Sequence, residues 1–185
     1  MILAFDISTS VVGFSVFNNS GALIELDCVK FRDKQTLFQK IDMFKDKIKH
    51  YEVAEVTHII IEEPLKKFAG KFSNATTISI LNNFNGMLSA YLYLTFGVEP
   101  EFINVQTARK TAFPELKLNT PEVKHEVWKK VVVCEPKINW RYSSKTGKLM
   151  DENYDMSDSY VVGRAFLRIL NDRKEIVLSE DYFKE

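Results

Sequence analysis

Cysteine is scarce in this 185-residue chain, which contains only Cys28 and Cys134. Neither belongs to a C-x-x-C pair, so the chain carries no recognisable zinc-binding or thioredoxin-like motif. Glycine is also scarce, with seven residues and no Gly-Gly pair. We expect both cysteines to pack as small apolar side chains in a reducing environment.

Long apolar segments are absent as well. The chain begins directly with a short apolar run, without the basic residues and the cleavage site that mark a secretory signal. The longest apolar stretch, residues 87–98, is too short and too polar for a membrane span. These absences predict a cytoplasmic protein with no membrane partner.

The formal net charge is zero, with 25 basic and 25 acidic residues, so composition alone does not indicate a nucleic-acid-binding protein. The charges are nevertheless separated along the chain, because residues 64–98 and 136–150 contain no acidic residue. The basic residues of these two segments are Lys66, Lys67, Lys71, Lys137, Arg141, Lys145 and Lys148. Basic runs of this kind are most often solvated surfaces.

Hydrophobic periodicity predicts an α/β fold. Short apolar runs predict five strands, near residues 1–8, 11–18, 22–31, 57–63 and 100–105. Helical spacing predicts four helices, near residues 35–51, 76–96, 121–133 and 151–170, the third capped by Thr120 with Pro121 at its first position. We expect one domain, residues 1–172, with a mixed sheet covered by helices on both faces, followed by a charged tail at 173–185.

Four carboxylates occupy informative positions. Asp6 ends the first apolar strand and Glu62 ends the fourth, where a charge is costly unless it is paired or bound to metal. We expect these strands to be parallel neighbours, whose carboxyl ends form the edge where α/β sheets bind ligands. Asp155 and Asp158 share one face of the last helix. Each acid alone is explained by turn or helix-start chemistry, but the combination predicts a common site.

Four like charges in one place repel one another and need positive charge among them. Hard divalent cations prefer oxygen ligands, and Mg²⁺ is the common choice. We therefore expect all four carboxylates to be metal ligands and catalytic groups, with two ions about 3.5–4 Å apart, an arrangement that suits displacement at a phosphodiester.

Three motifs carry a family resemblance: ILAFDISTSVVGFSVF (residues 2–17), IIIEEP (59–64) and DMSDSYVVG (155–163). In this order they resemble the RuvC-type Holliday-junction resolvases of the RNase H-like nuclease superfamily, and most closely the phage and virus branch. The resemblance spans about residues 2–170, and by motif position the family's four carboxylates match Asp6, Glu62, Asp155 and Asp158. Two departures are Ser8, where many members have glycine, and the lack of a histidine in the last helix.

The resemblance implies an RNase H-like fold with a five-stranded sheet. It implies a homodimeric endonuclease that uses Mg²⁺ or Mn²⁺ to resolve Holliday junctions and other branched DNA by paired nicks, as in DNA recombination and repair. A phage- or virus-encoded enzyme of this kind would act in the cytoplasm of its host cell.

Basic residues near the motifs are candidates for DNA binding. The segment after the Glu62 strand is placed to hold phosphates and contains Lys66, Lys67, Phe68 and Lys71. Phe68 is either a wedge that stacks on an unpaired base or a core residue. By the resemblance, three more basic residues fall in segments where the family carries active-site lysines: Arg109, Lys110 and Lys124.

The helix expected at residues 76–96 is apolar on more faces than one domain covers. It is either a central core helix or the interface of a homodimer, and the resemblance favours the interface. We expect the contact surface around residues 83–94 to include Leu88, with Gly86 and Ser89 allowing close approach.

Three other functions share parts of this pattern. A general RNase H-like flap or branch nuclease would carry the same carboxylates and differ only in substrate. An actin-like ATP-binding protein shares the Asp-x-Ser-Thr-Ser start, but it needs a second phosphate loop and a glycine-rich adenosine motif, which this chain lacks. A DNA-binding relative without catalysis would have lost its acids, and all four are intact here.

Overall fold

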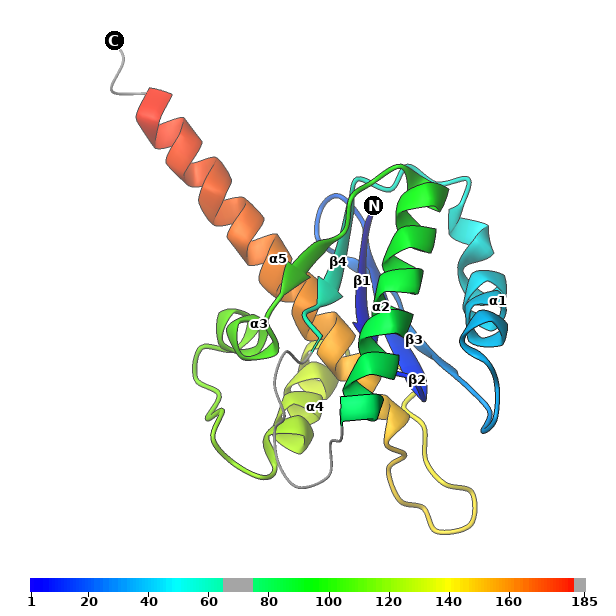
Figure 1. The fold of residues 1–185 in the computed structure, drawn as a ribbon. Coiled ribbons are helices and arrows are strands. Elements are labelled where there is room, and N and C mark those ends of the chain that lie inside the picture. The colour runs from blue at the N-terminus through cyan, green and yellow to red at the C-terminus, as the bar shows by residue number, and fades with distance from the viewer. Residues whose placement is uncertain (65–74, 182–185) are drawn as a thin grey trace.

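The computed structural model describes the backbone of residues 1–64 and 75–181, with side chains through residue 173. Five strands form one sheet in the order β3-β2-β1-β4-β5 (Figure 1). The strands are β1 (Ile2–Ile7), β2 (Val11–Phe17), β3 (Leu23–Lys30), β4 (His58–Glu62) and β5 (Glu101–Ile103). The first three are an antiparallel meander, whereas β4 is parallel to β1 and β5 is parallel to β4. The predicted five-stranded mixed sheet is therefore confirmed.

Helices cover both faces of this sheet. One face packs against α1 (Leu37–Ile48), which a turn of 3-10 helix, η1 (Lys49–Tyr51), prolongs, and against α2 (Ala75–Phe96). The other face packs against α3 (Val105–Ala112), α4 (Val123–Cys134) and α5 (Glu152–Asp181). The predicted helical layers are confirmed, and they divide the buried strand side chains between two cores.

The alternation of side chains along β1 assigns those cores. Leu3, Phe5 and Ile7 belong to the core under α1 and α2, whereas Ile2 and Ala4 belong to the core under α5. Since successive side chains point to opposite faces, Asp6 lies on the α5 face at the carboxyl end of its strand.

Close approach of α5 to the sheet depends on two glycines. A Cβ on Gly13 of β2 would overlap the main-chain carbonyl group of Asp155, and one on Gly163 of α5 would overlap the ring of Phe17. Between these points the buried Ser15 hydroxyl donates a 2.9 Å hydrogen bond to the main-chain oxygen of Ser159. The absence of side chains thus lets α5 lie directly on β1 and β2, next to Asp6.

Three helix predictions need correction. α3 was not predicted, because residues 105–112 are short and polar and show no long apolar period. α4 begins at Val123 rather than Pro121; the position before it is Glu122, whose side chain makes no capping bond. α5 continues to Asp181, past the expected end near residue 170. The division into a domain at 1–172 and a tail at 173–185 stays a prediction.

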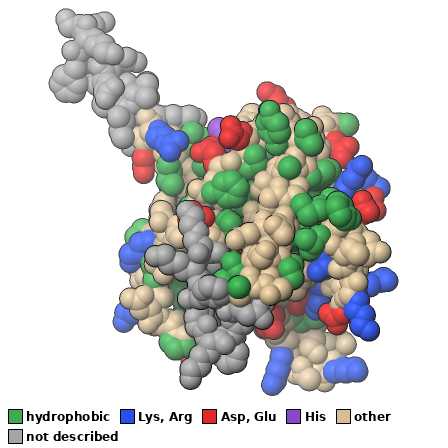
Figure 2. Space-filling view, viewed as in Figure 1, with side chains coloured by type: hydrophobic (Ala, Val, Ile, Leu, Met, Phe, Trp, Pro, Cys, Tyr) green, Lys and Arg blue, Asp and Glu red, His purple; other side chains and the backbone are tan. Residues whose placement is uncertain are grey.

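α2 has one buried and one exposed side. Phe84, Leu88 and Leu92 are fully buried in the core, so the expectation that Leu88 lies on an interface is wrong. On the other side Tyr93 and Leu94 are exposed, and a Cβ on Gly86 would meet no atom within 4 Å. Figure 2 shows hydrophobic side chains on this face of the molecule. Within the described part of the chain, no helix is long and apolar enough to span a bilayer.

Candidate active site

The site begins with two strand ends. The parallel register of β1 and β4 pairs Phe5 with Ile61, so Asp6 and Glu62 follow side by side at the carboxyl edge of the sheet. Both point to the α5 face by the two-residue period. The sequence predicts this neighbourhood, and the structure contains it.

α5 adds the third carboxylate. Asp158 is almost completely buried, and one carboxylate oxygen from each of Asp6, Glu62 and Asp158 lies within 4.8 Å of the others. Asp155, one turn earlier on α5, is not part of this trio, but its charge raises the pKa values of Asp6 and Glu62. The four predicted carboxylates therefore form one electrostatic unit, with three of them in a tight cluster.

Burial and mutual repulsion make ionisation of this unit costly. Burial raises the pKa of Asp6 well above its ordinary value of 3.8, and the charges of Glu62 and Asp158 raise it further. Burial is also the main cause that raises the pKa of Glu62 from 4.5 to about 8 and that of Asp155 from 3.8 to about 6. Without a bound cation, the cluster therefore remains partly protonated near neutral pH.

Among the described residues, Arg109 is the cation that contacts the cluster most directly. Its guanidinium Nη2 donates to both oxygens of Asp158, at 2.8 and 2.9 Å, and its Nε donates to Oδ1 at 3.1 Å. Both side chains are less than a tenth exposed. This planar, two-pronged contact is the strong form of an Arg–carboxylate pair, and it fixes one of the three clustered acids.

Lys124 of α4 is the second cation at the site. Its Nζ lies 3.7 Å from Asp158 Oδ2, while more than half of its side chain is exposed. Burial alone would lower the pKa of its ammonium, but the charges of Asp158, Asp6 and the other site acids raise it above 10.5. Lys124 therefore stays charged at the mouth of the site, where it can meet an anion from solvent.

The donor set fits a divalent metal. Glu62 Oε2 is buried and has no hydrogen-bond partner among the described residues, which costs free energy unless something binds it. Its neighbours are carboxylate oxygens, the ligands that Mg²⁺ and Mn²⁺ prefer. Asp6, Glu62 and Asp158 are thus the residues that could hold an ion.

The predicted DNA-binding residues have different outcomes. Four of them, Lys66, Lys67, Phe68 and Lys71, lie outside the described residues. Lys110 donates a 3.3 Å hydrogen bond to the main-chain oxygen of Leu116, at the outer end of α3. Arg109 is buried in the site, with its guanidinium bound to Asp158. A DNA-binding role for these residues stays a prediction.

The pairing of Arg109 with Asp158 is the feature that sequence reasoning missed. It depends on α3, which positions Arg109 in its last turn. A local signal for α3 exists, because Asn104 caps it by accepting a 3.0 Å hydrogen bond from the Gln106 amide. No sequence period, however, relates Arg109 to a partner 49 residues away.

Comparison with known proteins identifies the fold. No family model matches the chain, and no curated protein matches it in sequence. The structure of Thermus thermophilus RuvC has a TM-score of 0.59 at 10% identity, with 92% of this chain and 95% of that chain covered. RuvC of the same organism in complex with a Holliday junction substrate has a TM-score of 0.58 at 9% identity, with 92% and 94% covered. The chain thus has a RuvC-like, RNase H-like fold.

Loss of Arg109 is expected to destabilise the protein through Asp158. In chelator, Arg109→Leu leaves a buried carboxylate without its partner and should cost about 3–5 kcal/mol of unfolding free energy. Arg109→Leu with Asp158→Asn should cost clearly less than the sum of the single variants, because the stranded charge is gone. Urea unfolding of the wild type, the two single variants and the double variant measures this coupling.

The control is Arg168→Leu, which removes an exposed guanidinium bound to the Thr111 carbonyl. It should cost no more than about 1 kcal/mol of unfolding free energy. Additive effects would contradict the assigned pair.

The raised pKa of Glu62 predicts a pH-dependent stability. A carboxyl group whose pKa rises on folding stabilises the protein fully below its unfolded pKa of 4.5, and this contribution is lost as the pH rises through about 8. Between these limits in chelator, the Tm of the wild type should fall relative to that of Glu62→Gln, which does not ionise. A constant difference between the two melting curves across this range would show that Glu62 has an ordinary pKa.

Proposed function

We propose that this protein is a metal-dependent endonuclease that resolves four-way DNA junctions and related branched DNA by paired nicks. The observation that supports it best is the convergence of Asp6, Glu62 and Asp158 within 4.8 Å, with Glu62 Oε2 unpartnered, in a RuvC-like fold. The further assignment to the phage and virus branch rests on the sequence motifs alone.

The chain's own residues have distinct roles in this proposal. Asp6, Glu62 and Asp158 would hold Mg²⁺ or Mn²⁺, and Asp155, whose charge acts on the same cluster, would assist a second ion. The metal would supply positive charge for a phosphodiester and lower the pKa of a bound water. Arg109 keeps the Asp158 carboxylate oriented toward the cluster, and Lys124 offers an exposed ammonium to an incoming phosphate.

Paired nicks need two sites. A four-way junction presents two equivalent strands, so two active sites related by a two-fold axis match it. The exposed side of α2 supports a homodimer, because it carries Leu94 and Tyr93 in the open and small residues, Gly86 and Ala90, that allow two helices to approach closely.

Cutting of a synthetic four-way junction is the direct test of the function. Wild-type protein should nick it at paired positions in Mg²⁺ and leave it intact in chelator, while linear duplex is cut far more slowly. Equal cutting of flaps, other branches and junctions would favour the general branch nuclease, and no cutting of any DNA would contradict the proposal.

Replacement of one clustered carboxylate should abolish cutting while binding remains. Asp6→Asn should lower the nicking rate by more than about a hundredfold, since loss of even an outer partner of a metal ligand costs 10–100-fold. Junction binding in chelator should be retained, because phosphate contacts come mostly from basic residues. Asp151→Asn removes the same charge from an exposed acid just before α5 and should cut normally. Near wild-type cutting by Asp6→Asn would refute the site.

Charge on the exposed side of α2 should separate the dimer. Wild-type protein at micromolar concentration is expected to have twice the mass of one chain by light scattering. Gly86→Arg with Leu94→Asp should yield a folded monomer that nicks one strand without pairing its cuts. Val53→Asp changes an equally exposed apolar residue elsewhere and should stay dimeric. A wild-type monomer that still makes paired nicks would overturn this assignment.

A further inference from the structure

A second basic element lies outside the carboxylate cluster. Residues 141–150, here called the basic hairpin, form a protruding turn between α4 and α5 (Figure 1). Tyr142 and Leu149 pair across it, and the Ser143 amide donates to the Lys148 carbonyl at 2.8 Å. At the tip Gly147 has φ of +66°, a conformation that glycine adopts without steric cost. The segment is therefore a hairpin with an ordered main chain.

The base of the hairpin is anchored to α5. The buried Asn153 side chain accepts a 2.9 Å hydrogen bond from the Arg141 amide and donates to the carbonyl oxygens of Arg141 and Met150, at 2.6 and 2.8 Å. Beside it the rings of Trp140 and Trp128 meet edge to face, with centroids 6.1 Å apart. Asn153 is only two residues from Asp155, so the hairpin has a defined position relative to the active site.

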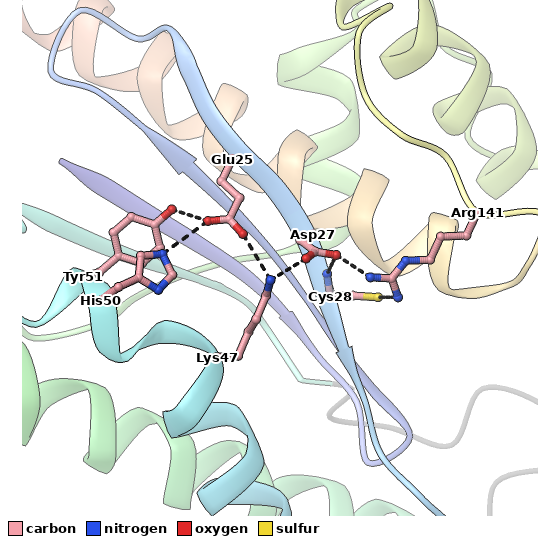
Figure 3. A network of polar contacts seen from close by, with 7 residues as sticks. All are labelled: Glu25, Asp27, Cys28, Lys47, His50, Tyr51 and Arg141. Atoms are coloured by element: carbon pink, nitrogen blue, oxygen red, sulfur yellow. Dashed lines mark hydrogen bonds and ion pairs between the residues drawn. The ribbon is translucent and has the colours of Figure 1, made fainter.

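The base is also anchored to the sheet. Figure 3 shows the Arg141 guanidinium in contact with Asp27 and Cys28 of β3. Asp27 in turn pairs with Lys47 of α1 at 2.6 Å, and Lys47 reaches Glu25. The Arg141 guanidinium thus binds Asp27 and Cys28 within the protein itself and is not available to a partner.

The other cations of the hairpin are free. Lys145 and Lys148 are exposed, and no described acidic side chain pairs with either of them. By contrast, Lys30 pairs with Glu152 at 2.7 Å and Lys129 pairs with Glu126 at 2.9 Å. Figure 2 shows Lys and Arg side chains projecting from the hairpin at the lower end of the molecule. The acid-free segment therefore presents positive charge that nothing in the described chain neutralises.

The hairpin lies at the same end of the molecule as the carboxylate cluster. Figure 1 shows it below the carboxyl ends of β1 and β4, the end where Asp6 and Glu62 lie and where α5 begins. A long polyanion that entered the active site would extend past the cluster, because its charges repeat along its length. The hairpin is placed to meet such a polyanion beside the point of cutting.

We propose that the basic hairpin is a docking element for the sugar–phosphate backbone of a duplex arm, contacted by Lys145 and Lys148. This inference rests on the proposed function, since it takes the polyanion to be the DNA cut at the cluster. The contact is sequence-independent and separate from the catalytic groups. Each lysine that neutralises a phosphate releases a counterion, so two contacts should make the slope of log K against log salt more negative by about 2.

Salt-dependent binding tests the docking role. The double variant Lys145→Gln with Lys148→Gln is compared with the wild type for binding to a four-way junction and to a linear duplex. Binding is measured in chelator, so that no cutting occurs. The affinity of the variant should fall for both probes. The slope of log K against log salt should become less steep by about 2, while the Tm stays that of the wild type. The matched control is Lys45→Gln on α1 with Lys49→Gln on η1, which should bind as the wild type does. Both lysines are exposed and lie on the face of the sheet opposite to α5, and Lys49 is 3.5 Å from Asp46.

The outcomes separate the two proposals. If the hairpin variant binds with unchanged affinity and slope while the wild type cuts junctions, the docking role is refuted and the nuclease stands. If the salt slope depends on the hairpin but the wild type cuts no DNA in Mg²⁺ or Mn²⁺, docking stands and the nuclease is refuted. If the wild type binds neither DNA, both are refuted.

Discussion

Like charges held out of water are the constraint around which this protein is organised. Asp6, Glu62 and Asp158 are brought within 4.8 Å in a site that is largely closed to solvent, an arrangement that folding alone disfavours. Burial raises the pKa values of Asp6 and Glu62, and each neighbouring carboxylate adds to the shift. Within the described part of the chain, the buried guanidinium of Arg109 and the exposed ammonium of Lys124 compensate for this charge. One carboxylate oxygen, Glu62 Oε2, still has no partner among the described residues.

Packing of α5 makes this concentration of charge geometrically possible. Its first turns lie directly on β1 and β2, where Gly13 leaves room for the main chain of Asp155. The Ser15–Ser159 hydrogen bond and the contact of Gly163 with Phe17 continue the same close packing along the helix. Substitution at Gly13 would push the acids of α5 away from Asp6. Small residues that carry no catalytic group thus determine the spacing of the cluster.

A network of polar side chains on β3 connects the sheet and α1 to the basic hairpin. Glu25 contacts Tyr51, His50 and Lys47, while Asp27 joins Lys47 to Arg141 (Figure 3). This chain of contacts connects η1 and α1, across the edge strand β3, to the segment that precedes α5. Individual surface ion pairs contribute little to stability, but a connected set that holds two elements in register determines geometry. In this protein the network positions the base of the hairpin, at Arg141, relative to the sheet.

Local sequence determined the strands of the sheet and identified all three carboxylates of the trio as candidates. Short apolar runs identified all five strands, because such runs depend only on neighbouring residues. They also placed Asp6 and Glu62 at the carboxyl ends of two strands that were expected to pair in parallel. The spacing of Asp155 and Asp158 also showed that they share a helical face. Tertiary structure decided the rest. It turned Leu88 into the core, formed the unpredicted α3, and brought Arg109 onto Asp158 and Arg141 onto Asp27. Such pairings join residues that are far apart in sequence, and no local period encodes them; they arise only when helices pack on the sheet and bury the charges together.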